Sequence, residues 1–181
     1  GHSGVVMHYD HGVWDQVDVG ATTGLLGVSG TGPGDVWMVS GYDVIQGDGS
    51  NWTTTTVLST SYFVDNWASA ANDVWAVSYH GEVVHYDGQS WSTSVTISGH
   101  LMTGIYASGP RDVWVAGRDG VIYHYDGAQW AQVDAGTPNS LHEIGGSSST
   151  DVWAVGDGGT IVQLDGQGFT TVDSGVTNDL R

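Results

Sequence analysis

A motif that begins Asp-Val-Trp occurs four times along this chain of 181 residues. Its aspartates are Asp35, Asp73, Asp112 and Asp151, so successive copies are 38, 39 and 39 residues apart. The chain also opens on GVVMHYDHGVW, which matches the second half of the repeat as it reads in residues 120–130. Periods of about 20 to 50 residues are typical of repeat architectures, in which each copy is one supersecondary unit. The sequence therefore predicts an array of similar units within one domain.

Each repeat contains four short apolar runs separated by Gly, Pro, Asp or Ser. In the third full copy these runs are 101–107, 112–117, 121–125 and 130–133. None reaches the ten or so residues that a helix needs, so we interpret them as strands. The second run is apolar on both of its faces, which means that both faces of the sheet must be covered. Sheets of this kind stack on their neighbours, and radial stacking closes into a β-propeller.

We therefore predict an all-β protein, a β-propeller of four-stranded antiparallel blades with a repeat of about 39 residues. Unpaired blade edges favour association, so we expect either self-association through these edges or a longer natural chain from which this array is an excerpt. The predicted segments are 1–20 (a partial blade with third and fourth strands), 21–58, 59–97, 98–136 and 137–175 (four complete blades) and 176–181 (the start of the next blade).

The tryptophans follow the repeat. Eight of the nine fall on predicted second or fourth strands, and Trp67 is the exception. In the third full copy, two-residue turns at 118–119 and 127–128 would place Asp112 opposite Tyr125, and Tyr125 opposite Trp130. We predict that these residues form one cross-strand row, because paired aromatic side chains stabilise adjacent strands.

A histidine recurs in the predicted third strand, at His8, His85 and His124, whereas glutamine occupies this position at Gln46 and Gln163. Glutamine forms hydrogen bonds but does not perform general acid–base catalysis. We therefore predict a structural hydrogen bond for these histidines.

The best-preserved copies read DVWAVGDGGTIVQLDG and DVWVAGRDGVIYHYDGAQW. This pattern resembles the tectonin-type repeat and the bacterial tectonin-like β-propeller repeats related to it. The resemblance covers nearly the whole chain and rests on scaffold residues. It implies a lectin-like, glycan-binding propeller, and we expect an extracellular or cell-surface bacterial protein.

The composition narrows the choice of partners. Three arginines, no lysine and 20 acidic residues give a net charge of −17, which would repel the phosphates of nucleic acid and an anionic bilayer. No apolar run of about 18 residues occurs, so we expect no membrane insertion. Cysteine is absent, which excludes disulfides and thiolate metal sites. A glycan or a protein surface remains as the expected partner.

The turn between the second and third strands varies from copy to copy, which makes it the candidate ligand-binding rim. We predict Tyr42, Tyr79, His80 and Asp119 as ligand-binding residues. An aromatic ring beside a carboxylate suits a sugar, because the ring contacts C–H groups and the acid accepts hydroxyl hydrogen bonds. For any single one of these residues, a solvated polar turn is the alternative.

Two acidic residues interrupt the predicted first strands, which line the channel of a propeller. Asp65 and Glu143 could meet there and bind Ca²⁺ through oxygen ligands, and solvated carboxylates are the alternative. We expect no other cofactor.

Evidence for catalysis is sparse. The chain has no nucleophile elbow, no zinc-ligand spacing and no phosphate-binding loop. Sialidase Asp boxes also differ, because Gly127 and Trp130 follow Asp126 by one and four residues here instead of two and five. We therefore predict a non-catalytic binding propeller that recognises carbohydrate. The alternatives are a polysaccharide-active enzyme and a protein-interaction or architectural propeller.

Overall fold

The computed structural model describes residues 4–58, 60–166 and 168–181. Four four-stranded antiparallel sheets and one two-stranded hairpin make up the fold, which confirms the predicted all-β propeller. The predicted starts of the segments 1–20 and 59–97 lie outside the described residues. Within the part of the chain that is described, no helix is both long and apolar enough to cross a membrane.

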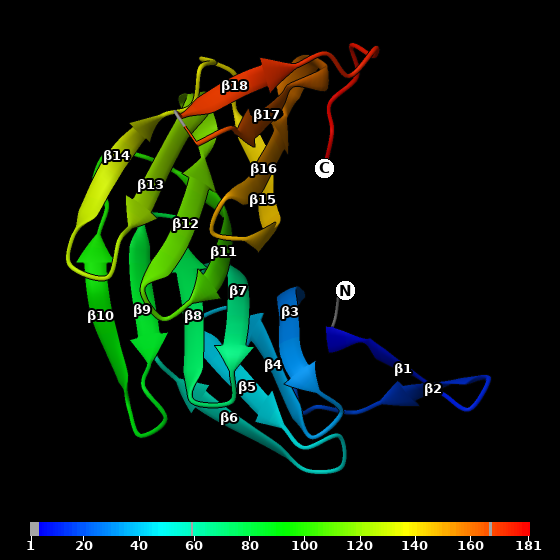
Figure 1. The fold of residues 1–181 in the computed structure, drawn as a ribbon. Coiled ribbons are helices and arrows are strands. Elements are labelled where there is room, and N and C mark those ends of the chain that lie inside the picture. The colour runs from blue at the N-terminus through cyan, green and yellow to red at the C-terminus, as the bar shows by residue number, and fades with distance from the viewer. Residues whose placement is uncertain (1–3, 59, 167) are drawn as a thin grey trace.

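The hairpin and the four blades follow one another along the chain (Figure 1). The hairpin comprises β1 (Val6–Asp10) and β2 (Val13–Val17). The first blade comprises β3 (Leu25–Gly32), β4 (Asp35–Ser40), β5 (Asp43–Gly47) and β6 (Trp52–Thr56). The second comprises β7 (Phe63–Ala70), β8 (Asp73–Ser78), β9 (Glu82–Tyr86) and β10 (Trp91–Thr96). The third comprises β11 (Met102–Gly109), β12 (Asp112–Gly117), β13 (Val121–Tyr125) and β14 (Trp130–Asp134). The fourth comprises β15 (Leu141–Ser148), β16 (Asp151–Gly156), β17 (Ile161–Leu164) and β18 (Phe169–Val172).

The blades are arranged in an arc around a common axis (Figure 1). Their first strands, β3, β7, β11 and β15, contact one another in sequence along the inner side of the arc. The buried apolar residues form clusters that adjacent blades share. All six residues of β8 are buried, whereas most residues of the outer strand β10 are not. The core therefore lies between the blades, as the two apolar faces of the second strand predicted.

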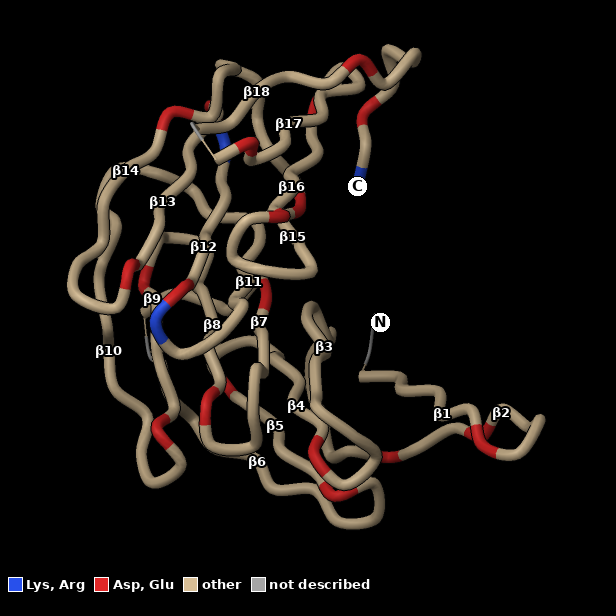
Figure 2. The backbone as a smooth tube through the Cα atoms, viewed as in Figure 1, with Lys and Arg blue, Asp and Glu red and all other residues tan. Residues whose placement is uncertain are grey.

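Acidic residues concentrate at turns and connections (Figure 2). In the turns between third and fourth strands, Asp48, Asp87 and Asp126 each accept hydrogen bonds from two backbone N–H groups. These N–H groups hold the pKa of each carboxyl below its ordinary value. These three carboxylates thus have a structural role in the turns.

The predicted cross-strand row is correct in one pair and wrong in the other. Tyr125 lies opposite Trp130, with ring centroids 5.4 Å apart, as predicted. Val113 lies opposite Tyr125, so the predicted pairing of Asp112 with Tyr125 is wrong.

The turn between the second and third strands explains this error. Arg118–Gly120 forms a three-residue 3₁₀ turn in the third blade, and Asp157–Gly159 does so in the fourth. Asp119 and Gly120 have φ values of 59° and 66° in the left-handed region. The third turn residue shifts the pairing by one position relative to a two-residue turn.

Aromatic side chains connect successive blades. Trp75 of the second blade packs against Tyr125 and Trp130 of the third, with ring centroids 5.8 and 6.2 Å away. Trp114 packs in the same way against Phe169 of the fourth blade, at 5.5 Å. The recurring aromatic residues therefore join one blade to the next.

Candidate functional site

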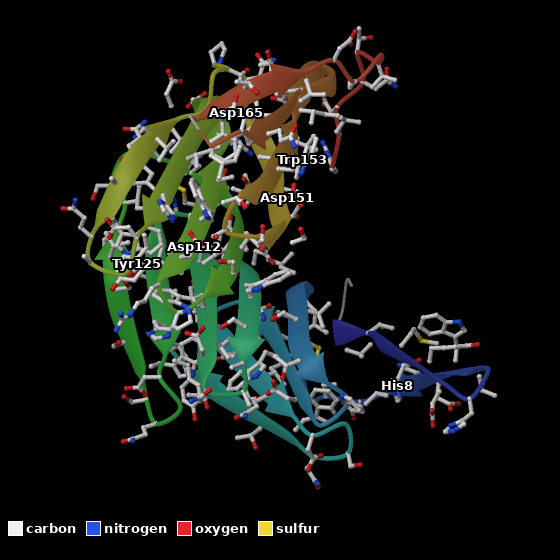
Figure 3. The ribbon with its side chains drawn as sticks, viewed as in Figure 1. His8, Asp112, Tyr125, Asp151, Trp153 and Asp165 are labelled. Atoms are coloured by element: carbon white, nitrogen blue, oxygen red, sulfur yellow. The ribbon has the colours of Figure 1, made fainter. Side chains whose placement is uncertain are left out.

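The aspartate of each Asp-Val-Trp motif accepts hydrogen bonds from side chains of its own blade. In the second blade, Asp73 Oδ1 accepts the indole N–H of Trp75 at 3.0 Å and lies 2.7 Å from His85 Nε2, while Asp73 Oδ2 accepts the hydroxyl of Ser69. The His85 ring stacks on Trp75 with centroids 4.0 Å apart. The corresponding aspartates of the other blades, Asp35, Asp112 and Asp151, also accept an indole N–H and a hydroxyl, and Figure 3 labels Asp112 and Asp151.

The structural hydrogen bond predicted for the histidines is confirmed for His85 and His124, which both contact the motif aspartate at 2.7 Å. His8 is exposed on the hairpin, which projects beyond the first blade (Figure 3). The hydroxyl donor was not predicted from the sequence. A Ser or Thr four residues before each aspartate was the available signal.

The predicted rim residues Tyr79 and His80 lie in the second-blade turn beside two further side chains. Tyr62 stacks on Tyr79 with centroids 5.2 Å apart and planes 14° from parallel. The Arg118 guanidinium lies 5.7 Å from the centre of the Tyr79 ring. His80 Nδ1 is 3.1 Å from the hydroxyl of Ser61.

The other two predicted rim residues lie on neighbouring turns. Tyr42 belongs to the first-blade turn and is 46% exposed, and its carbonyl accepts two backbone N–H groups. Asp119 is exposed in the third-blade turn, and its N–H donates to Ser140 Oγ at 3.4 Å. Among the described residues, neither a ring contact nor a hydrogen bond joins Tyr42 or Asp119 to Tyr79. Tyr62 and Arg118 are therefore its partners instead.

The predicted channel acids lie on the inner strands. Asp65 accepts the backbone N–H of Asn66 at 2.8 Å and that of Ile105, in the next blade, at 2.9 Å. Burial, together with the charge of Glu143, raises the pKa of Asp65 to about 7. Burial also raises the pKa of Glu143. Both oxygens of Asp65 already accept an N–H group, which reduces their capacity to bind a cation. A Ca²⁺ site at these residues stays a prediction.

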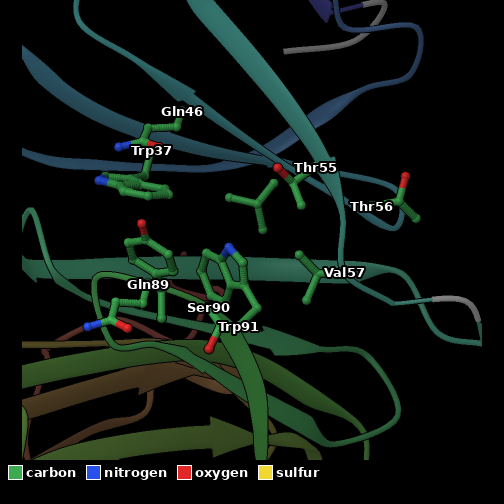
Figure 4. Close-up of a pocket in the computed structure, with 10 residues that line it drawn as sticks. Trp37, Gln46, Thr55, Thr56, Val57, Gln89, Ser90 and Trp91 are labelled. Atoms are coloured by element: carbon green, nitrogen blue, oxygen red, sulfur yellow. The ribbon is translucent and has the colours of Figure 1, made fainter.

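A pocket of about 410 Å³ lies between the first and second blades (Figure 4). Trp37 from β4 faces Tyr86 from β9 and Trp91 from β10, with ring centroids 5.3 and 6.0 Å away. The remaining lining residues are Val44, Gln46, Thr55, Thr56, Val57, Gln89 and Ser90. Its aromatic walls come from different repeats, so the pattern within one repeat did not predict this pocket.

Polar side chains in the pocket form fewer hydrogen bonds than the residues at equivalent positions between the second and third blades. There, Trp130 Nε1 donates a hydrogen bond to Ser94 Oγ at 3.0 Å across two blades. Trp91 and Thr55 occupy the equivalent positions at the pocket. Among the described residues, no hydrogen bond joins Trp91 to Thr55, and Gln46 makes none with its side chain. An indole N–H, an amide and a hydroxyl are thus available to a ligand.

Neither a scan against protein-family models nor a search of curated proteins finds a match. Solved structures do match. YCF48 bound to D1 peptide has a TM-score of 0.71 and 15% identity, over 96% of this chain and 62% of that one. YCF48 from Cyanidioschyzon merolae has a TM-score of 0.71 and 15% identity, over 91% and 64%. The β-propeller domain of Myceliophteria thermophila Cps50 (Swd1) has a TM-score of 0.62 and 11% identity, over 78% and 52%. This chain spans less than two thirds of each of these structures, and the similarity shows that it has a β-propeller fold.

Proposed function

We propose that this chain is a non-catalytic binding propeller that holds a carbohydrate in the pocket between the first and second blades. The observation that supports this proposal most directly is the pair of half-buried rings Tyr86 and Trp91, backed by the buried Trp37, beside amide and hydroxyl groups and an indole N–H of Trp91 that has no hydrogen-bond partner among the described residues. Aromatic rings pack on the C–H face of a sugar, and amides and hydroxyls bind its hydroxyl groups. The volume lies within the range of about 300 to 1,000 Å³ for small-molecule sites. The tectonin-type resemblance favours the same ligand class.

The pocket suits binding better than hydrolysis. Glycosidases commonly use two Asp or Glu residues that flank the bond to be cleaved. The ten residues that line this pocket include neither Asp nor Glu. We therefore favour recognition without turnover.

A glycan array followed by titration calorimetry on any hit tests this proposal. Replacing Thr55 with Val removes one hydroxyl from the pocket wall at nearly constant volume. One neutral hydrogen bond contributes about 0.5 to 1.5 kcal/mol, so affinity should fall by roughly 2- to 13-fold. Ser94→Val is the matched control, because it makes a similar change at the equivalent position of the next interface.

Equal weakening by both variants would contradict the pocket assignment, as would the absence of any glycan ligand. A hydrolysis assay on each bound glycan tests the alternative of a polysaccharide-active enzyme, because release of reducing sugar would identify turnover.

Protein recognition at the rim is a second candidate. The stack of the exposed Tyr62 on the half-buried Tyr79, with Arg118 beside it, offers aromatic and cationic contacts on a highly acidic protein. One similar structure is that of YCF48 bound to D1 peptide. Tyr79→Ala separates the two candidate functions. It should weaken the binding of peptides selected from a library against the parent and leave glycan binding in the pocket unchanged.

A further inference from the structure

Three metal-ligating side chains meet on the fourth blade, apart from the inter-blade pocket and the Tyr79 stack. His142 lies on β15, Asp157 in the turn before β17, and Asp179 in the segment after β18. One ligand atom from each lies within 4.8 Å of the other two. We propose that His142, Asp157 and Asp179 bind a divalent transition-metal ion, with Zn²⁺ as the representative.

Two of the donor atoms are hydrogen-bonded to each other and lie closer together than the ligands of a bound ion, so side chains must rotate to admit one. His142 Nε2 lies 2.5 Å from Asp157 Oδ1, and their side chains are 24% and 46% exposed. Zinc binds nitrogen and carboxylate oxygen at about 2.0 to 2.2 Å, which places tetrahedral donors roughly 3.3 Å apart. A small outward rotation of the exposed Asp157 carboxylate, together with an inward rotation of the exposed Asp179 carboxylate, would admit the ion. Solvent reaches the site, so entry requires no rearrangement of the blade.

Backbone hydrogen bonds keep the segment that carries the third ligand beside the site. Asp179 Oδ1 accepts the N–H of Gly158 at 3.0 Å, and Leu180 donates its N–H to the carbonyl of Gly156 at 3.0 Å. The segment that carries Asp179 is therefore attached to the same turn that carries Asp157. Hydrogen bonds to a ligating carboxylate orient it toward a metal. Among the described residues, no arginine forms an ion pair with either carboxylate.

The third blade shows that the turn does not need these residues. The same three positions there hold Thr103, Arg118 and Ser140. Ser140 Oγ accepts the backbone N–H of the third-blade turn at 3.4 Å, which is the bond that Asp179 makes in the fourth blade. A hydroxyl is sufficient to cap this turn. An imidazole and two carboxylates thus exceed what the scaffold requires.

The donor set indicates the class of ion. Imidazole nitrogen together with carboxylate oxygen suits Zn²⁺ and its transition-metal neighbours, whereas Ca²⁺ and Mg²⁺ prefer oxygen ligands throughout. Three protein ligands leave at least one coordination position open. The site should therefore prefer Zn²⁺ to Ca²⁺.

Equilibrium dialysis of the EDTA-treated chain against Zn²⁺, with metal analysis of the protein, tests the proposal. We expect about one Zn²⁺ per chain, which Ca²⁺ at the same concentration does not displace. Asp179→Ser should weaken binding by about 10-fold or more, because it removes a ligand. Ser140 in the third blade indicates that this variant keeps the turn hydrogen bond, and circular dichroism without metal checks that it folds.

Asp173→Ser is the matched control, because it makes the same change in the same segment outside the cluster, and it should bind Zn²⁺ like the parent. His142→Ala provides a second test. The proposal is overturned if Asp179→Ser and His142→Ala retain parent affinity, which would point to exposed histidines such as His11, or if the parent binds less than about a fifth of an equivalent.

Discussion

At the residue scale, the environment of each carboxylate decides its charge. Asp73 is buried, which by itself would raise the pKa of its carboxyl, but hydrogen bonds from His85 and Ser69 outweigh burial and hold the pKa below its ordinary value. Asp73 therefore stays ionised and accepts the indole N–H of Trp75. Among the described residues, Asp65 accepts hydrogen bonds from two backbone N–H groups, and burial beside Glu143 raises its pKa to about 7.

Asp65 should make stability depend on pH. Its pKa is raised from 3.8 to about 7 on folding, so between these values the folded state binds more protons than the unfolded state. The contribution of Asp65 to the free energy of unfolding is therefore present at about pH 4 and is lost as the pH rises toward 7. Each unit of pKa corresponds to about 1.4 kcal/mol. The free energy of unfolding of the parent, measured with urea, should be lower at about pH 8 than at about pH 4.5. In Asp65→Asn this decrease should be much smaller.

Asp15→Asn, on the exposed outer hairpin, is the control and should leave the pH dependence unchanged. A parent and an Asp65→Asn variant with the same pH dependence would show that Asp65 does not titrate in this range.

At the element scale, turn conformation decides which residues of adjacent strands face each other. The 3₁₀ turn Arg118–Gly120 has one residue more than a two-residue hairpin loop, which moves Val113 opposite Tyr125. Gly120 ends this turn with a φ of 66°, a region that residues with a Cβ rarely adopt. A Cβ at Gly120 would also lie 1.9 Å from the carbonyl oxygen of Thr137, in the connection to the next blade.

Gly120→Ala should therefore destabilise the protein by more than about 2 kcal/mol, because the cost of about 1 to 2 kcal/mol for left-handed backbone adds to the clash. Gly99→Ala is the control. Gly99 has a φ of 85°, and a Cβ at this position would meet no atom of the described residues within 4 Å, so only the backbone cost applies. Denaturant unfolding measures both variants, and equal losses of stability would contradict the clash with Thr137.

At the scale of the whole molecule, each blade is stabilised mainly by its neighbours. Trp37 is 2% exposed and packs against Tyr86 and Trp91 of the second blade, so removing it affects an interface as well as a blade. Arrays of this kind have a stability that is roughly the sum of repeat and interface contributions. A substitution in one blade should therefore destabilise the adjacent blades more than the distant ones.

Hydrogen exchange tests this expectation. Trp37→Ala should lower the local free energy of unfolding by about 3 to 5 kcal/mol. Amides of β4 and β8 should exchange faster than in the parent, while those of β16 should change much less, because no core cluster of the described residues joins the first blade to the fourth. Equal acceleration in all four blades would instead indicate one cooperative unit.

The sequence by itself determined the fold class, the number of complete blades and the strands on which eight tryptophans lie. These features follow from local patterns, since strand length, alternation and turn residues repeat with a period that is visible in the chain. The hydrogen bonds of His85 and His124 were predictable for the same reason, because the exchange with glutamine limits the chemistry of that position.

Only the tertiary structure decided which side chains of different blades and turns meet. Trp37 and Trp91 line one pocket although 54 residues separate them, and Tyr62, which was not among the predicted rim residues, stacks on Tyr79. Such proximity depends on how far one blade rotates against the next and on how many residues each turn contains. The rotation is set by packing between repeats, which the pattern within a single repeat does not reveal. The length of the turn depends on its backbone conformation, which the predicted two-residue turn did not include.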